Sequence, residues 1–209
     1  SYAVQARKEA YKKDEGNARE QFPFVPCTVI GTPSTLDDKI ICGVRGGATS
    51  TGKADIVGGY MTATNIFQNP VFANFYNEEN EEMGVARGEV DRCNLIGHFE
   101  DGSPPNLCFI MDARLNLNSD DVIERHRAAY AEYAKHVASG NGEMTSRKSI
   151  ACAGHAAVDA WEHTELFAIP KDLDYLRKVI AESYIEHNGK RLEPMRNMTA
   201  ALKLLLARE

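Results

Sequence analysis

The sequence lacks a long apolar run and an excess of positive charge. No stretch approaches the roughly 20 apolar residues that a membrane-spanning helix requires. The 24 Lys and Arg residues are outnumbered by 30 Asp and Glu residues, so no overall positive field exists to attract nucleic acid or an anionic membrane. Residues 1–20 are charged where a secretion signal would be apolar. We therefore expect a cytoplasmic protein with no nucleic-acid or membrane partner.

Metal-binding patterns of cysteine and histidine are also missing. The five cysteines are an odd number, stand singly and include no Cys-x-x-Cys pair. The six histidines are scattered, and none lies one helical turn from another. The sequence thus gives no sign of a zinc site, and we expect the cysteines to be small buried hydrophobic side chains with no catalytic role.

What is present is the composition of an ordinary globular domain. With 209 residues, 43% hydrophobic and 26% charged, the chain is long enough to bury a core without disulfide bonds or a structural metal. Strand-like runs such as KIICGVRGG (39–47) and LCFIMDARL (107–115) alternate with amphipathic segments, without a strict βαβ rhythm. This order predicts a single domain (1–209) of the α/β class, a sandwich of helices around a mixed sheet.

Local signals place several helix ends. Pro70 suits the first turn of a helix, and Gly84 suits the position after its last turn. Ser119 is a suitable N-cap for a helix whose apolar residues recur at helical spacing. The Ala-rich segment 149–161 is expected to be helical.

Both ends of the chain are predicted to be helical. We expect residues 1–21 to form a peripheral helix with a thin apolar stripe, and the last helix to place Leu192, Met195 and Met198 on its inner face. The stripe at the start and the methionines at the end suggest more apolar surface than one domain needs. We therefore expect a homodimer.

One glycine-rich stretch comes close to a phosphate-binding loop. Gly47, Gly52 and Lys53 have the spacing of GxxxxGK[ST], whose backbone amides cradle phosphates. Position 54 is Ala, however, so the hydroxyl that would hold magnesium is missing, and the residues that follow make a poor helix start. The stretch is therefore not interpreted as a nucleotide-binding loop of this type.

An acidic cluster lies in the segment NEENEEMGV (77–85). Positions i, i+3 and i+4 share a helix face, so Glu78, Glu81 and Glu82 project together while Glu79 points elsewhere. Three carboxylates on one stripe repel one another, and a divalent cation with oxygen ligands would relieve that repulsion. The alternative is a solvated acidic helix face, which is what most charge runs are.

The surroundings of this cluster resemble the Nudix hydrolase family. NEENEEMGV is similar to the second half of the Nudix box, RExxEExG followed by an apolar residue. GKADIVGG (52–59) is similar to the lead-in to the box, KIICGVRGG to the strand before it, and EHTELFAIPKDL (162–173) to a late segment of the family. Three departures stand beside these matches: Asn77 occupies the position of the box Arg, the upstream Glu is missing, and the stretch from Gly59 to Glu78 is longer than usual.

The resemblance implies a Nudix-like α/β/α sandwich and a Mg²⁺- or Mn²⁺-dependent hydrolase. Its substrate would be a nucleoside diphosphate linked to another group, and the reaction would cleave the pyrophosphate bond. Glu78 and Glu82 would be metal ligands together with a backbone carbonyl of Gly58 or Gly59. Glu81 would be a further ligand or a proton acceptor.

Other roles follow from the same resemblance. Glu165, or with less support Glu162, would serve as general base, and the alternative for both is a surface acid that precedes a strand. Arg45 and Lys53 are candidate contacts for substrate phosphates, with solvated loop cations as the alternative.

Residues 116–161 form a longer segment than the family usually has, and we interpret them as an inserted helical segment. Insertions of this kind commonly carry specificity, and Arg147 is placed to contact an anionic ligand. A second function remains open, because Asn77 cannot supply the paired hydrogen bonds that an Arg gives to carboxylates. In that case the protein is a catalytically impaired Nudix-like module that binds a nucleotide-type ligand.

Overall fold

The computed structural model describes residues 26–46, 50–61, 69–101, 106–138, 150–152, 155–158 and 162–208. The helix expected at 1–21 lies outside these residues. The main sheet contains β1 (Cys27–Ser34), β2 (Lys39–Arg45), β3 (Ala54–Asp55), β4 (Gly58–Tyr60), β5 (Val90–Asp101), β6 (Asn106–Leu115) and β9 (His163–Pro170). The helices are α3 (Pro70–Met83), α4 (Ser119–Ala138), α5 (Leu173–Glu182) and α6 (Arg196–Leu206), with a short 3₁₀ turn, η1 (Arg87–Glu89).

The main sheet is mixed, and β1 changes partner along its length. β1 runs parallel to β6, and β5 pairs antiparallel with β6 at the edge of the sheet. On its other side β1 meets β2 where Ser34 faces Ile40. Nearer its start the partner of β1 is β4, while β2 pairs with β3 on one side and with β9 on the other. This arrangement carries Gly58 and Gly59 into the middle of the sheet.

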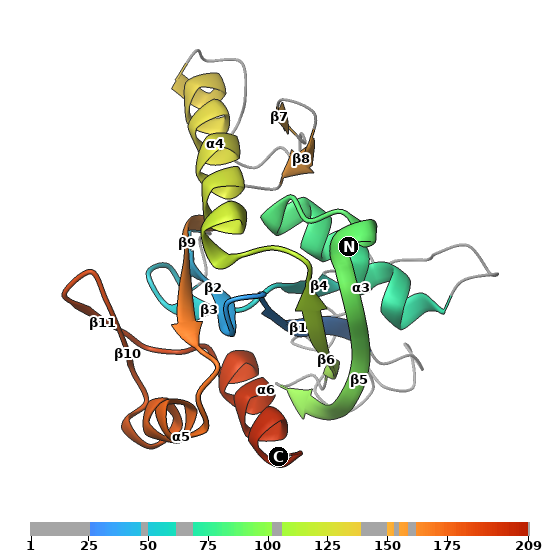
Figure 1. Ribbon diagram of the computed structural model, residues 1–209, viewed down its shortest axis with the longest axis vertical. Coiled ribbons are helices and arrows are strands. Elements are labelled where there is room, and N and C mark those ends of the chain that lie inside the picture. The colour runs from blue at the N-terminus through green and yellow to red at the C-terminus, as the bar shows by residue number, and fades with distance from the viewer. Residues whose placement is uncertain are drawn as a thin grey trace, which may run out of the picture.

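Helices cover both faces of the sheet (Figure 1). Phe75 of α3 and Val122 of α4 belong to the core on one face, whereas Leu176 of α5 and Leu202 of α6 belong to the core on the other. The predicted sandwich of helices around a mixed sheet is therefore confirmed. None of the helices in the described part of the chain is both long and apolar enough to span a membrane.

Two predicted helix starts are confirmed. α3 begins at Pro70, and the Asn69 side chain accepts a hydrogen bond from the backbone N–H of Val71. The helix ends before Gly84, whose φ of 70° is the left-handed conformation that favours glycine. α4 begins at Ser119 itself, so the start predicted with Ser119 as the N-cap is right to within one residue.

Two other helix predictions are wrong. The segment 149–161 contains an antiparallel hairpin of β7 (Ile150–Cys152) and β8 (His155–Val158), so the described part of the expected helical segment 116–161 includes strands as well as α4. The last helix begins only at Arg196. Leu192 lies in a second hairpin, made of β10 (Ile185–His187) and β11 (Lys190–Leu192), and Met195 is the residue that precedes α6.

Candidate active site

The acidic residues of α3 point in three directions. Glu78 and Glu82 reach β4, Glu79 is buried in the protein interior, and Glu81 is exposed to solvent. The backbone N–H of Gly58 donates a hydrogen bond of 3.2 Å to Oε2 of Glu82. The structure thus brings Glu78 and Glu82 together at β4, while Glu81 lies on the solvent side of α3.

Close approach explains both glycines of β4. A Cβ atom at Gly58 would lie 2.5 Å from the carbonyl oxygen of Val29, which is on the neighbouring strand β1. A Cβ atom at Gly59 would lie 2.4 Å from the carboxylate oxygens of Glu78. A side chain at Gly58 would therefore displace the backbone of β1, whereas a side chain at Gly59 would displace the Glu78 carboxylate from β4.

β9 adds two side chains to the same place. The carboxyl group of Glu162, just before β9, interacts with Glu82 through charge and a side-chain hydrogen bond. The ring nitrogen Nδ1 of His163 lies 3.9 Å from Oε2 of Glu82, and His163 is almost completely buried. His163 was not predicted as a site residue, because the histidines have no metal-binding spacing in the sequence.

The electrostatics of Glu82 are those of a carboxyl group in a crowded acidic environment. Burial raises the pKa of Glu82 well above its usual value, and repulsion from Glu162, Glu78 and Asp55 raises it further. Among the described residues, Oε1 of Glu82 has no hydrogen-bond partner. A bound cation would stabilise this arrangement, because it would neutralise neighbouring carboxylates and occupy the unpaired oxygen.

The histidines nearby carry no compensating charge. Burial lowers the pKa of His163 to about 3, with further contributions from His126 and Arg45. Burial also lowers the pKa of His126, on α4, to about 4, although a hydrogen bond with the backbone of His163 acts in the opposite direction. Both imidazole rings are therefore neutral at pH 7.

Arg45 supplies positive charge at this end of β2. Its Nη1 donates a hydrogen bond of 2.7 Å to Oδ2 of Asp55, a buried residue of β3. Burial raises the pKa of Asp55, while Arg45, the N–H of Ile56 and the side chain of Asn197 act to lower it. Arg45 is also attracted to Glu162 and Glu82, so the predicted phosphate contact lies among acidic side chains of the protein itself.

Glu165 and Lys53 are not brought to the acidic cluster. Oε1 of Glu165 lies 3.0 Å from Nε2 of His187 and accepts a hydrogen bond from Asn188, on the side of the sheet that carries α5. Lys53 forms an ion pair of 2.9 Å with Glu193. Arg147 lies outside the described residues.

An irregularity in the sheet separates Glu165 from Glu162. Val44 pairs with Glu165, but the next residue, Arg45, pairs with His163. This bulge interrupts the alternation of side chains along β9. His163 then faces α3, whereas Glu165 faces the hairpin β10–β11. Of the two acids considered as general base, Glu162 is therefore the one beside Glu82.

Glu79 is an additional unusual carboxyl group. It is fully buried, and neither of its carboxyl oxygens has a hydrogen-bond partner among the described residues. Burial raises its pKa to about 8. The signal for its burial was present in the sequence, because Phe75, Glu79 and Met83 recur at intervals of four on the apolar stripe of α3.

The described residues contain no group of three or more His, Cys, Asp or Glu side chains arranged to hold a metal ion. Glu78 and Glu82 are two carboxylates at one place, which is the number that Mg²⁺ often takes from a protein. Mg²⁺ is usually bound by one or two carboxylates, with water and substrate phosphates completing its six positions. The residues present fit that kind of site.

Comparison with known proteins identifies the fold. No protein-family model and no curated protein matches the chain in sequence. The chain is similar in structure to the NUDIX domain of Shewanella oneidensis NrtR complexed with ADP ribose, with a TM-score of 0.52 and 9% identity, over 96% of this chain and 97% of that chain. It is also similar to a bifunctional NMN adenylyltransferase/ADP ribose pyrophosphatase from Francisella tularensis, with a TM-score of 0.53 and 9% identity, over 99% of this chain and 46% of that chain. The predicted Nudix-like fold is thereby confirmed.

Proposed function

We propose that this Nudix-fold protein is a Mg²⁺- or Mn²⁺-dependent hydrolase that cleaves the pyrophosphate bond of a nucleoside diphosphate linked to another group. One observation supports this function best: Glu82 is held by the N–H of Gly58 beside the carboxyl groups of Glu78 and Glu162. Buried acids are costly unless they are paired or bind a cation. Their convergence at the glycines of β4 therefore favours a site for a metal ion and phosphates.

The cation would be held by Glu78 and Glu82 with a backbone carbonyl of Gly58 or Gly59. When bound, it would polarise a phosphoryl oxygen and acidify a water molecule. The hydrogen bond from Gly58 fixes the direction of the Glu82 carboxylate before substrate arrives. Such fixed geometry matters, because misplacement of a catalytic group by about 1 Å can cost ~10²-fold in rate.

We assign the proton-accepting role to Glu162 rather than Glu165. Glu162 is partly exposed and lies beside Glu82, so its carboxylate has access both to the acidic cluster and to solvent. Glu81, exposed on α3, remains a candidate for a further ligand or proton acceptor. A phosphate contact by Lys53 requires its surface ion pair with Glu193 to open, which costs less than about 1 kcal/mol.

A binding module is the second candidate function. The observation in its favour is Asn77, which is exposed and stands where the Nudix box has an Arg. Without an Arg to orient the carboxylates, the site would bind a nucleotide-type ligand but turn it over slowly or not at all.

A comparison of binding with turnover separates the two functions. Purified protein is incubated with a panel of nucleoside diphosphate derivatives, ADP-ribose among them, with Mg²⁺, with Mn²⁺ and with a chelator. We expect metal-dependent release of phosphomonoester products, reduced at least about 100-fold in Glu82→Gln. The surface variant Glu124→Gln on α4 is the matched control and should keep the activity. Tight binding of a panel member with no turnover would identify the binding module instead.

A further inference from the structure

We infer that Arg45, on β2, positions the carboxylates of Glu82 and Glu162, in place of the Arg that the Nudix box would have at Asn77. This inference rests on the proposed function. Arg45 acts here as a positioning residue, whose charge attracts the acids, and not as a contact for the substrate.

α3 itself offers no cation for this task. Its sequence, PVFANFYNEENEEM, contains no Lys or Arg, and Asn77 is exposed. Two other positively charged residues, Lys53 and Arg87, have different partners. Lys53 pairs with Glu193, and the guanidinium of Arg87 lies 5.0 Å from the centre of the Tyr76 ring.

Backbone pairing between the ends of β2 and β9 brings Arg45 close to the acidic cluster. Arg45 is the register partner of His163, whose ring lies 3.9 Å from the Glu82 carboxylate. The next residue, Gly46, donates its N–H to the carbonyl oxygen of Glu162 at 2.8 Å. Arg45 and Glu162 are thus fixed on adjoining strand ends, and the guanidinium is attracted to both Glu162 and Glu82.

The guanidinium is itself anchored. Asp55 accepts its hydrogen bond at 2.7 Å, and the other oxygen of Asp55 accepts the N–H of Ile56 at 2.9 Å. The side chain of Asn197, on α6, also hydrogen-bonds Asp55. A planar guanidinium held by a buried carboxylate has donors left over in fixed directions, which a flexible ammonium group would not provide.

The balance of charge leaves room for a divalent cation. Four carboxyl groups, those of Asp55, Glu78, Glu82 and Glu162, interact with one another or with the single guanidinium of Arg45. One positive charge reduces the repulsion between the acids without cancelling their negative charge. Arg45 therefore orients the carboxylates by attraction, and the excess negative charge remains available to a metal ion.

Removal of Arg45 alone would leave Asp55 buried without its partner, which is strongly destabilising. The test therefore uses Asp55→Asn as its background. Four proteins are compared: wild type, Asp55→Asn, Asp55→Asn/Arg45→Gln, and the last of these with Asn77→Arg added. Two readouts are measured, the amide proton shift of Gly58 by NMR and the steady-state constants for hydrolysis of the best panel substrate.

The Gly58 amide reports on Glu82 without any substrate, because it donates to the Glu82 carboxylate. We expect it to move upfield from its position in Asp55→Asn when Arg45 is also removed, and to return toward that position with Asn77→Arg. In parallel, kcat should fall by about 10²-fold with KM within about twofold, since misplaced catalytic groups lower the rate of the chemical step. Asn77→Arg should recover part of that loss.

An unchanged Gly58 amide in Asp55→Asn/Arg45→Gln would overturn the inference. A raised KM at unchanged kcat would overturn it as well, because it would make Arg45 a phosphate contact. If the Gly58 amide responds as expected but no panel member is hydrolysed by the wild type, Arg45 positions Glu82 and the proposed hydrolase activity is the part that fails.

Discussion

Glu79 shows how one side chain can set the pH dependence of stability. Its pKa is about 8 in the folded protein because of burial, compared with an ordinary value of 4.5. The folded state therefore binds the Glu79 proton more tightly than the unfolded state. The stability that this group contributes is fully present below pH 4.5 and is lost as the pH rises through 8.

Glu79→Met tests this effect. Between pH 5 and pH 8 the free energy of unfolding of the wild type should decrease relative to that of Glu79→Met, by up to about 1.4 kcal/mol per pH unit. Urea unfolding at several pH values measures the difference. The exposed neighbour provides the control, and Glu81→Gln should follow the wild type. Parallel curves for wild type and Glu79→Met would show that Glu79 is not a buried acid.

Glu162 and Glu165 make a matched pair for the active site. Both are acids in the same segment, but only Glu162 interacts with Glu82, while Glu165 contacts His187. We expect Glu162→Gln to lower kcat by about 10²-fold or more, the range expected for loss of a general base, and Glu165→Gln to leave kcat within about twofold. Rate constants measured at saturating metal and substrate decide between them, and the reverse pattern would place the base on the other face of the sheet.

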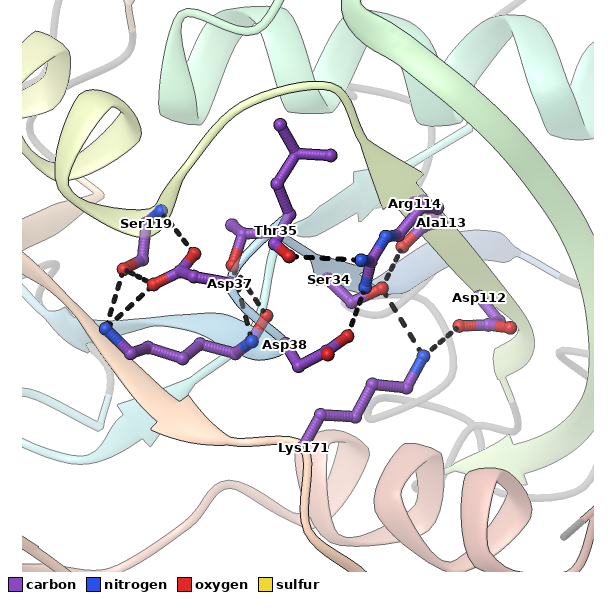
Figure 2. A network of polar contacts seen from close by, with 11 residues as sticks. Ser34, Thr35, Asp37, Asp38, Asp112, Ala113, Arg114, Ser119 and Lys171 are labelled. Atoms are coloured by element: carbon purple, nitrogen blue, oxygen red, sulfur yellow. Dashed lines mark hydrogen bonds and ion pairs between the residues drawn. The ribbon is translucent and has the colours of Figure 1, made fainter.

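Among the elements, α4 is attached to the sheet by a polar network at its first turn. Figure 2 shows Asp37, in the turn between β1 and β2, accepting hydrogen bonds from the backbone N–H and the hydroxyl of Ser119, at 2.9 and 2.7 Å. Lys39 pairs with the same carboxylate at 2.8 Å. Burial acts to raise the pKa of Asp37, but hydrogen bonds from Lys39, Thr35 and Ser119 outweigh it and hold the pKa well below its usual range. Asp37 thus caps α4 from another element.

Asp37→Asn should reveal the strength of this attachment. The amide keeps the shape but loses the charge, and we expect a loss of about 1 kcal/mol in the free energy of unfolding, because hydrogen bonds to a charged group are stronger than those to a neutral one. Asp38→Asn is the matched control, because Asp38 is highly exposed in its pair with Arg114 and Asn tolerates its φ of 53°. Chemical denaturation measures both variants. Equal losses would mean that Asp37 does not cap α4.

The elements that the sequence predicted correctly have clear local signals, whereas the two wrongly predicted segments contain short hairpins. The limits of α3 follow from Pro70 and Gly84, which act within a single turn. The hairpin β10–β11 had a local signal too, the Asn188-Gly189 turn with positive φ at both residues, but the helical spacing of nearby apolar residues outweighed it.

The site was predictable in part for the same reason. Glu78 and Glu82 share a helix face through local geometry, and their approach to Gly58 and Gly59 agrees with the predicted order of segments. The choice of Glu162 over Glu165 depends on a bulge between β2 and β9. No spacing within β9 reveals that bulge, because it is a property of two strands far apart in the sequence.

At the scale of the whole molecule, the expected homodimer remains a prediction. The methionines of the last helix no longer support a dimer, because Met198 is completely buried in the core and Met195 packs against that core. The other reason, residues 1–21, lies outside the described residues. Light scattering at high micromolar concentration should show twice the chain mass of 23.1 kDa if the prediction holds. A single-chain mass would contradict it.

In the proposed function, a Nudix fold with an altered box uses Glu82 and a divalent cation to hydrolyse a pyrophosphate bond. The most direct measurement is ³¹P NMR of a nucleoside diphosphate derivative incubated with the protein and Mg²⁺ in ¹⁸O-labelled water. We predict that the pyrophosphate signals give way to phosphomonoester signals, one of them shifted by ¹⁸O, and that Glu82→Gln or a chelator prevents the change. Pyrophosphate signals that persist for every panel member incubated with the wild-type protein, with both Mg²⁺ and Mn²⁺ supplied, would contradict the proposed hydrolysis.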